Sequence, residues 1–121
     1  MIAASIVLGI HLASVHREPG FNNANVGAYV QFESGLTAGV VENSYRRTSF
    51  YAGWTWETAD KRFALTAGAI TGYPSAKVSP LLVPSYRHDM GDGWSARISY
   101  LPKPPRYGAS DAVHASIERR F

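Results

Sequence analysis

Two pairs of basic residues stand in segments that the sequence predicts to be loops. Arg46 and Arg47 are adjacent, and Lys103 and Arg106 lie among three prolines. A guanidinium group matches two phosphate oxygens at once, so Arg46 and Arg47 suit the phosphates of a lipid headgroup. Neighbouring arginines are also common in solvated loops, and the second basic loop has the same two interpretations.

Serine and histidine are the remaining candidates for covalent chemistry. The chain has four histidines and no cysteine, which excludes a disulfide scaffold, a thiolate metal site and a cysteine nucleophile. A serine becomes an acyl-transfer nucleophile when an imidazole accepts its hydroxyl proton, and a third group usually orients that imidazole. No metal-ligand spacing, phosphate-cradling glycine loop or nucleic-acid motif occurs in the sequence, so we expect neither a metal nor a cofactor.

Short runs of alternating apolar and polar residues recur along the chain, separated by Gly, Asn, Asp and Pro. The alternation predicts eight strands and no helix, at about residues 4–15, 26–33, 36–42, 49–57, 63–70, 78–86, 94–101 and 112–121. Pro80 and Pro84 indicate an irregular or edge-like sixth strand. Because 121 residues are the size of one domain, we predict that residues 1–121 form a single all-β domain, an eight-stranded antiparallel up-and-down β-barrel.

The alternation alone does not say whether the apolar face points into the barrel or out of it. A soluble barrel hides that face inside, whereas a membrane barrel turns it toward lipid around a polar lumen. Two features favour the membrane: Tyr29, Gln31 and Glu33 would fill a narrow polar interior, and the last strand ends in Phe121, as outer-membrane barrels commonly do. Arg119 is the exception, because it would lie on the lipid face, where it is tolerated only near an interface.

Composition is compatible with either environment. Hydrophobic residues make up 45% of the chain and charged residues 17%, below the roughly 25% usual for a soluble domain. Tyr51, Trp54, Trp56 and Tyr100 fit the aromatic belts of a membrane interface but would equally fill a core. The net charge of +3 suits anionic headgroups or nucleic acid, and nucleic acid, which rests on charge alone, is not an expected partner.

The apolar segment 2–13 is interpreted as part of the first strand. It lacks a basic start, and no Ala-x-Ala site follows it, so it does not fit a signal peptide. We expect either that a leader has been removed or that there never was one, and the second case counts against an outer-membrane location. No run of about 18 or more uncharged apolar residues occurs, so a transmembrane helix is not expected.

From the predicted third strand onward, the order of features resembles the lipid A palmitoyltransferases, the PagP family of eight-stranded outer-membrane barrels. The segment Val41-Glu-Asn-Ser-Tyr-Arg-Arg47, followed by Tyr51-Ala-Gly-Trp-Thr-Trp56, resembles that family's Asp-Ser segment and the Ala-Gly-aromatic strand behind it. Further similarities are the Phe-terminated last strand, the proline-flanked segment Ser79-Pro-Leu-Leu-Val-Pro-Ser85, the segment Ile98-Ser-Tyr-Leu-Pro102, and Phe21-Asn-Asn23, which is similar to a Tyr-Asn-Glu element.

The resemblance implies an outer-membrane enzyme that moves an acyl chain from a phospholipid to lipid A. By the same resemblance, Ser44 matches the family's serine and Asn43 its aspartate, while His11 is the best match to its histidine and His16 the second. Thr55 falls near the glycine that sets acyl-chain length in the family, so a different or shorter chain is expected.

Three departures from the family leave an alternative open. Asn43 replaces the aspartate, the first loop is shorter, and no amphipathic helix precedes the barrel. Asn43 can orient an imidazole but carries no negative charge to stabilise imidazolium. Ser44 also suits a turn, and His11 and His114 suit lumen-facing groups. The alternative is a non-catalytic soluble or phage-derived barrel, in the cytoplasm or a virion, that acts as a binding or structural module, and the oligomeric state stays open.

Overall fold

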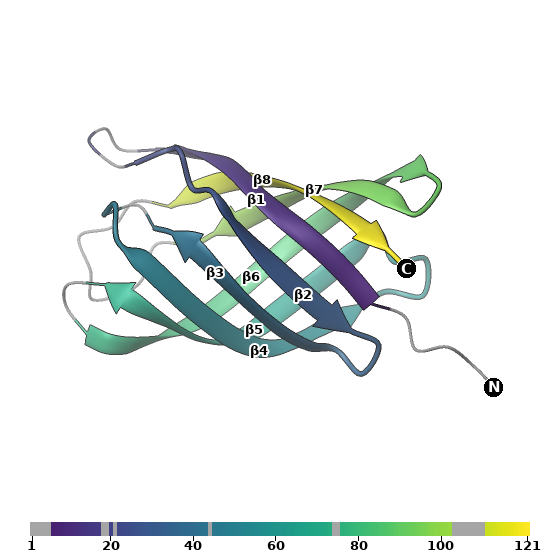
Figure 1. The fold of residues 1–121 in the computed structure, drawn as a ribbon, viewed down its shortest axis with the longest axis horizontal. Helices are drawn as coiled ribbons and strands as arrows, with labels where there is room; N and C mark the ends of the chain where they lie inside the picture. Colours follow the sequence, from purple (N-terminus) through teal and green to yellow (C-terminus); the bar gives the residue numbers. More distant parts are fainter. Residues whose placement is uncertain (1–5, 18–19, 21, 44, 74–75, 103–110) are drawn as a thin grey trace.

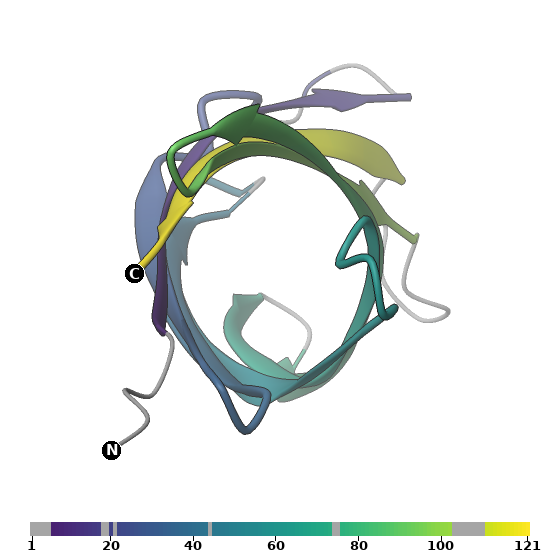
Figure 2. The same ribbon diagram turned by 90° about the vertical axis from the view of Figure 1, so that its right-hand side faces the viewer.

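The computed structural model describes residues 6–17, 20, 22–43, 45–73, 76–102 and 111–121. Eight antiparallel strands form one closed sheet in chain order, and β1 pairs with β8 to complete the barrel (Figures 1 and 2). This confirms the predicted eight-stranded up-and-down β-barrel. The strands are β1 Ile6–His16, β2 Gly27–Phe32, β3 Leu36–Glu42, β4 Thr48–Glu57, β5 Phe63–Tyr73, β6 Ala76–Gly91, β7 Trp94–Leu101 and β8 Ala112–Arg120.

The two ends of the barrel carry different connections. Short turns at 33–35, 58–62 and 92–93 lie at the end where the chain terminates, which we call the turn end. Strands β1, β3, β5 and β7 end at the opposite end of the barrel, which we call the loop end (Figure 1). The turn between β6 and β7 has positive φ at both central residues, Asp92 and Gly93, as a two-residue hairpin turn requires. In the turn after β4, the Thr58 hydroxyl and the Arg62 amide donate to the Asp60 carboxylate and hold its pKa below the ordinary value.

The apolar face of the barrel points outward and the polar face inward. Phe50 is 62% exposed, whereas Glu118 is 2% exposed and points into the lumen. The exposed apolar side chains come from every strand and include Leu8, Ile10, Val15, Phe32, Phe50, Trp54, Trp56, Phe63, Leu65, Val78, Leu82, Trp94, Ile98, Tyr100 and Val113. The buried polar side chains include Ser14, Gln31, Thr37, Ser49, Thr55, Thr66, Arg87, Ser95, Arg97, Ser99, His114, Ser116 and Glu118. The lumen is therefore lined by polar side chains, and the outer wall is apolar.

Arg119, the exception noted in the sequence, lies at the turn end. Its guanidinium carbon is 5.3 Å from the ring centre of Trp94 and 5.2 Å from that of Phe121. Stacking on aromatic faces stabilises the cation, and a position next to the chain terminus leaves it near the rim of the apolar wall. The arginine is thus compatible with an outward apolar face.

A β-bulge interrupts the alternation of β1. The register with β8 shifts between His11 and Ala13, so Leu12 and Ala13 are both exposed. After the bulge, Ser14 and His16 take the inward positions that strict alternation would give to Ala13 and Val15. Bulges of this kind re-aim side chains, and here the bulge turns Ser14 into the lumen.

The proline-containing strand β6 is long and is not an edge strand, because the barrel closes around it. It spans 16 residues, further at each end than the predicted 78–86, and pairs with both β5 and β7. Within the described chain, pairing with β7 begins at Ser85, whereas Pro80 and Pro84 pair only with β5. The irregularity expected from the prolines is therefore confined to the loop-end half of β6.

Two lumen tyrosines lie flat against glycines of neighbouring strands. Tyr29 is opposite Gly9, and Tyr51 is opposite Gly39. A methyl group added at either glycine would overlap the tyrosine ring. These glycines leave room for the rings along the wall, so Tyr51 is a lumen residue and not part of an outer aromatic belt, while Trp54, Trp56 and Tyr100 face outward.

Candidate functional site

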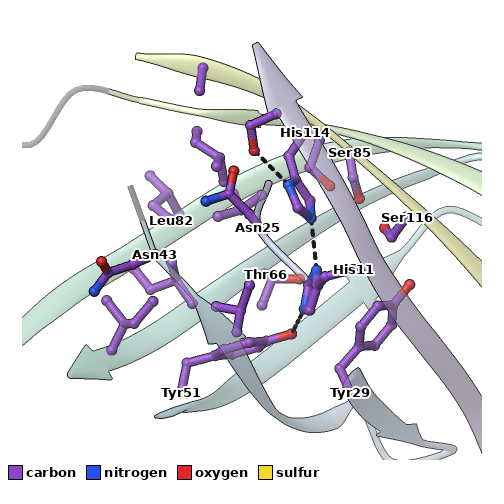
Figure 3. Close-up of a pocket in the computed structure, with 18 of the residues that line it drawn as sticks. His11, Asn25, Tyr29, Asn43, Tyr51, Thr66, Leu82, Ser85, His114 and Ser116 are labelled. Atoms are coloured by element: carbon purple, nitrogen blue, oxygen red, sulfur yellow. Dashed lines mark hydrogen bonds between the residues drawn. The ribbon is translucent and has the colours of Figure 1, made fainter. Parts of the chain in front are cut away.

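A cavity of about 410 Å³ occupies the loop-end half of the lumen (Figure 3). Side chains from all eight strands line it. It reaches the loop end, where His16, Asn25, Asn43 and Pro102 border it. Its volume lies within the range of ordinary small-molecule pockets.

A cluster of charged side chains, which we call the charge cluster, closes the lumen toward the turn end. Arg87 bonds both Glu57 and Glu118, Arg120 reaches Glu57 at 3.0 Å, and Arg97 reaches Glu118 at 3.5 Å. Buried charges are tolerated when they are paired and hydrogen-bonded in this way. Among its members, Arg97 borders the cavity.

A chain of four hydrogen-bonded side chains, which we call the relay, runs along the cavity. Ser14 Oγ is 2.7 Å from His114 Nδ1, and His114 Nε2 is 2.8 Å from His11 Nδ1. His11 Nε2 is in turn 2.7 Å from the Tyr51 hydroxyl. Figure 3 shows the His11 ring between Tyr51 and His114, joined to both by dashed lines. Each imidazole therefore uses both ring nitrogens.

Apolar side chains form a separate part of the wall. Ile70 of β5 and Leu81 and Val83 of β6 border the cavity. In the closed barrel β5 lies opposite β1, which carries His11 and Ser14. One side of the cavity therefore suits an apolar group, and the other carries acid–base groups.

Outward-facing residues in the loop-end half of β6 also border the cavity. Pro80 and Leu82, whose side chains are exposed on the outer wall, border it as well. This is the half of β6 that lies before its first described pair with β7, Ser85 with Ser99. The cavity is thus adjacent to the apolar exterior on this side.

Three buried polar atoms of residues that line the cavity have no hydrogen-bond partner within the described residues. They are Asn25 Oδ1, Ser79 Oγ and Arg97 Nε, the last of which lies 3.5 Å from Glu118 Oε2. Buried polar atoms without partners are uncommon in folded proteins. A bound molecule with complementary groups would satisfy Asn25 Oδ1 and Ser79 Oγ.

The structure brings three of the predicted site residues to this one cavity: His11, His16 and Asn43. His11 is a hydrogen-bonded lumen group within the relay. His16 ends β1 at the loop end, where its Nδ1 is 2.6 Å from Asn23 Oδ1. Ser44, the predicted nucleophile, lies outside the described residues.

Asn43 holds the connection between β3 and β4. Its amide nitrogen donates to Ser49 Oγ and to the Gly72 carbonyl, and its side-chain oxygen accepts the backbone amides of Tyr45 and Arg47. Figure 3 shows Asn43 well away from the His11 ring. These contacts make Asn43 a loop-organising residue and leave the orientation of His11 to the relay.

The other predicted binding residues lie outside the cavity lining. Arg46 and Arg47 are exposed in the connection after β3, and Arg46 has a positive φ of 62°. Thr55 is buried, and its hydroxyl lies 2.8 Å from both the Thr37 and the Thr66 hydroxyls. Thr37 and Thr66 border the cavity, but Thr55 does not.

Sequence reasoning missed Ser14 and Tyr51 as members of this site, although it predicted that His114 faces the lumen. Strict alternation from Leu12 would have put Ser14 on the outer wall, and only the bulge reverses this. Tyr51 alternates with Phe50 and Ala52 and so shares a face with Ser49, Gly53 and Thr55. That position was the available signal.

Within the described residues no group of three or more His, Asp or Glu side chains could hold a metal ion, and no helix is long and apolar enough to cross a membrane.

No protein-family model matches the chain, and no curated protein sequence matches it either. The site itself therefore carries the functional argument.

Proposed function

We propose that this protein is an outer-membrane β-barrel that takes the acyl chain of a phospholipid into its lumen and transfers it to lipid A. The observation that carries the proposal is the distribution of side chains, which is the reverse of that in a soluble barrel: the outer wall is apolar and the lumen is polar. In water the outer wall would expose a continuous apolar surface, far larger than a soluble monomer normally shows. In a bilayer the same wall faces lipid, and the polar groups are satisfied in the lumen.

The aromatic side chains support a membrane position. Trp54, Trp56 and Trp94 are exposed on the outer wall near the turn end, and Trp54 Nε1 donates to the carbonyl of Ser34 in the adjacent turn at 3.1 Å. Tryptophan concentrates at membrane–water interfaces, where its ring is apolar and its N–H finds a polar partner. These residues would mark the interface at the turn end.

The cavity supports an acyl-chain ligand. Ile70, Leu81 and Val83 would contact the hydrocarbon, while the ester group would lie near the histidines. A chain leaving the bilayer has a route past Pro80 and Leu82, where the cavity meets the outer wall. Proline has no amide hydrogen, so this part of β6 is suited to a break in the sheet.

Acyl transfer requires a serine and an imidazole base within reach of the ester. His11 borders the cavity, and the family resemblance assigns Ser44 as its serine. The guanidinium groups of Arg46 and Arg47 would bind lipid phosphate. A second candidate function, a barrel that binds an acyl chain without transferring it, is favoured by Asn43, which replaces the family's aspartate and whose side chain is occupied in holding its loop.

The test uses the full chain, purified in detergent and refolded into vesicles that contain labelled phospholipid and lipid A. The proposal expects labelled lipid A to appear, and expects Ser44→Ala or His11→Ala to reduce it in protein that is still folded by circular dichroism. A protein that binds the chain but transfers none would support the binding barrel. A chain that stays monodisperse and folded without detergent would overturn the membrane location.

A further inference from the structure

The relay places a serine next to an imidazole inside the cavity, at a position that neither the alternation nor the family resemblance predicts. We propose that Ser14 is the acyl-accepting nucleophile of this barrel, that His114 is its general base, and that His11 positions His114. The identity of the acyl donor rests on the proposed function above, whereas the reactivity of Ser14 does not.

The geometry of the pair is that of a nucleophile and its base. Ser14 and His114 are register partners on β1 and β8, and their side chains meet at 2.7 Å. This lies within the reach that proton abstraction requires. Ser14 is 4% and His114 5% exposed, and both border the cavity. The pair is thus shielded from bulk water and open to a molecule bound in the lumen.

The bulge in β1 brings the Ser14 side chain to His114. It lies between His11 and Ser14, and it brings both side chains to the lumen, where an unbroken strand would bring only one of them. Without it, the Ser14 hydroxyl would face the outer wall beside Leu12. Bulges are frequent next to active sites for this reason.

Two opposite arrangements of protons satisfy the whole relay, and the proposed chemistry uses the one that starts at Ser14. In it the Ser14 hydroxyl donates to His114 Nδ1, His114 Nε2–H donates to His11 Nδ1, and His11 Nε2–H donates to the Tyr51 oxygen. Each imidazole then carries one proton, as a neutral ring does. His114 Nδ1 is left as the acceptor that a nucleophilic serine needs.

His11 takes the place that a carboxylate holds in a Ser-His-Asp triad. It fixes the tautomer and the orientation of His114, which are two of the functions of the third group. It brings no negative charge. His11 is linked to a carboxylate only indirectly. The ring centre of Tyr29 is 4.8 Å from that of His11, and the Tyr29 hydroxyl donates to the Glu118 carboxylate.

The reaction has two balanced steps. Ser14 Oγ attacks the ester carbonyl carbon; the Oγ–C bond forms, the ester C–O bond breaks, and the serine proton passes through His114 Nδ1 to the leaving alcohol oxygen. A hydroxyl of the acceptor then attacks the acyl-serine. Its proton passes through His114 to Ser14 Oγ as the acyl–serine bond breaks, which regenerates the serine.

The experiment labels the full chain, folded in detergent, with a fluorophosphonate probe and locates the modified residue by mass spectrometry. We expect the label on Ser14. We expect Ser14→Ala to abolish it and His114→Ala to slow it by roughly 100-fold, as for loss of a general base. Ser99→Ala is the matched control, because Ser99 also borders the cavity and is the register partner of His114 from β7. It should label like the parent chain.

Two rescues separate chemistry from folding. Added imidazole should restore part of the labelling of His114→Ala. His11→Gln, which keeps an acceptor for His114 Nε2–H, should label faster than His11→Ala. If Ser14→Ala does not fold, Ser14→Cys and Ser99→Cys replace it, since the chain has no other cysteine. The Ser14→Cys thiol should be alkylated faster than the Ser99→Cys thiol, and His114→Ala should remove the difference.

The possible results separate this inference from the proposed function. Label on Ser44 or Ser99, or labelling that is the same with and without His114, overturns the inference. Transfer to lipid A that is lost in Ser44→Ala but kept in Ser14→Ala overturns it as well, and leaves the proposed function standing. Label on Ser14 without any transfer to lipid A supports the nucleophile and refutes the proposed donor and acceptor.

Discussion

Tyr29 lies flat across Gly9 of the neighbouring strand, and from there its hydroxyl donates to Glu118 Oε2 at 2.6 Å. The absence of a side chain at Gly9 therefore lets the Tyr29 ring lie close to the barrel wall. In that position Tyr29 connects the relay to the charge cluster. His11 packs on the same ring. A side chain at Gly9 would displace the Tyr29 ring and disturb its contacts with Glu118 and His11.

We predict that Gly9→Ala destabilises the barrel by about 1–3 kcal/mol, the usual cost of overpacking. The added methyl would overlap the Tyr29 ring. Urea unfolding in detergent micelles or thin bilayers measures the change. In the double variant Gly9→Ala, Tyr29→Val the loss should be smaller than the sum of the single changes, because the smaller side chain gives way. Strictly additive losses would contradict this packing.

The fold could be predicted because each strand carries its own alternation and its own punctuation. The predicted strands 36–42 and 94–101 coincide with β3 and β7, since each follows a turn marked by glycine, at Ser34-Gly35 and at Asp92-Gly93. The other six predicted strands differ from the observed ones at one or both ends, including β2 and β6, which precede the same two turns. β6 continues to Gly91, through His88 and Asp89, because pairing with β7 overrides the polar sequence.

The relay could not be predicted in the same way. Ser14 and His114 are 100 residues apart, and their contact depends on how β1 and β8 are registered when the barrel closes. The bulge at Leu12 and Ala13 has no glycine or proline to mark it. Alternation therefore identified His11 and His114 as lumen residues but assigned Ser14, the hydrogen-bond partner of His114, to the opposite face.

We predict that Glu118→Gln costs about 3–5 kcal/mol of stability, the range for breaking a buried ion pair on one side. The substitution leaves Arg87 and Arg97 with one carboxylate fewer and removes the charge that accepts the Tyr29 hydroxyl. Glu33→Gln, at an exposed position near the turn end, is the matched control and should change stability by less than about 0.5 kcal/mol. Equal effects in urea unfolding would show that the charge cluster does not hold the lumen closed.

The outer wall makes a depth-dependent prediction. Ile10 and Val15 are both exposed on β1, at 52% and 72%, with Ile10 in the middle of the strand and Val15 near the loop end. In lipid bilayers Ile10→Arg should destabilise by about 2–4 kcal/mol and Val15→Arg by about 0–1 kcal/mol, because the penalty falls toward the interface. Unfolding from vesicles measures both. Two neutral substitutions would mean that this wall does not face lipid.

The cavity makes a prediction about ligand size. Val83 borders the cavity, whereas Val78, also on β6, is exposed on the outer wall and is not among the residues that line the cavity. We predict that Val83→Trp weakens binding of a fluorescent fatty acid by roughly tenfold, or about 1.4 kcal/mol, because the indole fills space needed by the chain. Val78→Trp should bind nearly as the parent does. Binding unchanged by Val83→Trp in folded protein would place the ligand elsewhere.

The family resemblance and the observed packing imply different roles for Thr55. The resemblance implies that the residue here sets acyl-chain length, but the Thr55 hydroxyl is bonded to Thr37 and Thr66 and lies outside the cavity lining. Thr55→Val should therefore cost about 1–3 kcal/mol, because it leaves the buried Thr66 hydroxyl without its partner while Thr37 keeps the Gly35 carbonyl, and should leave chain-length preference unchanged. Ile70→Ala, which enlarges the cavity itself, should shift that preference toward longer chains. Unfolding curves and competition among fatty acids of graded length measure the two effects. A shifted preference in Thr55→Val with unchanged stability would favour the resemblance over the packing seen here.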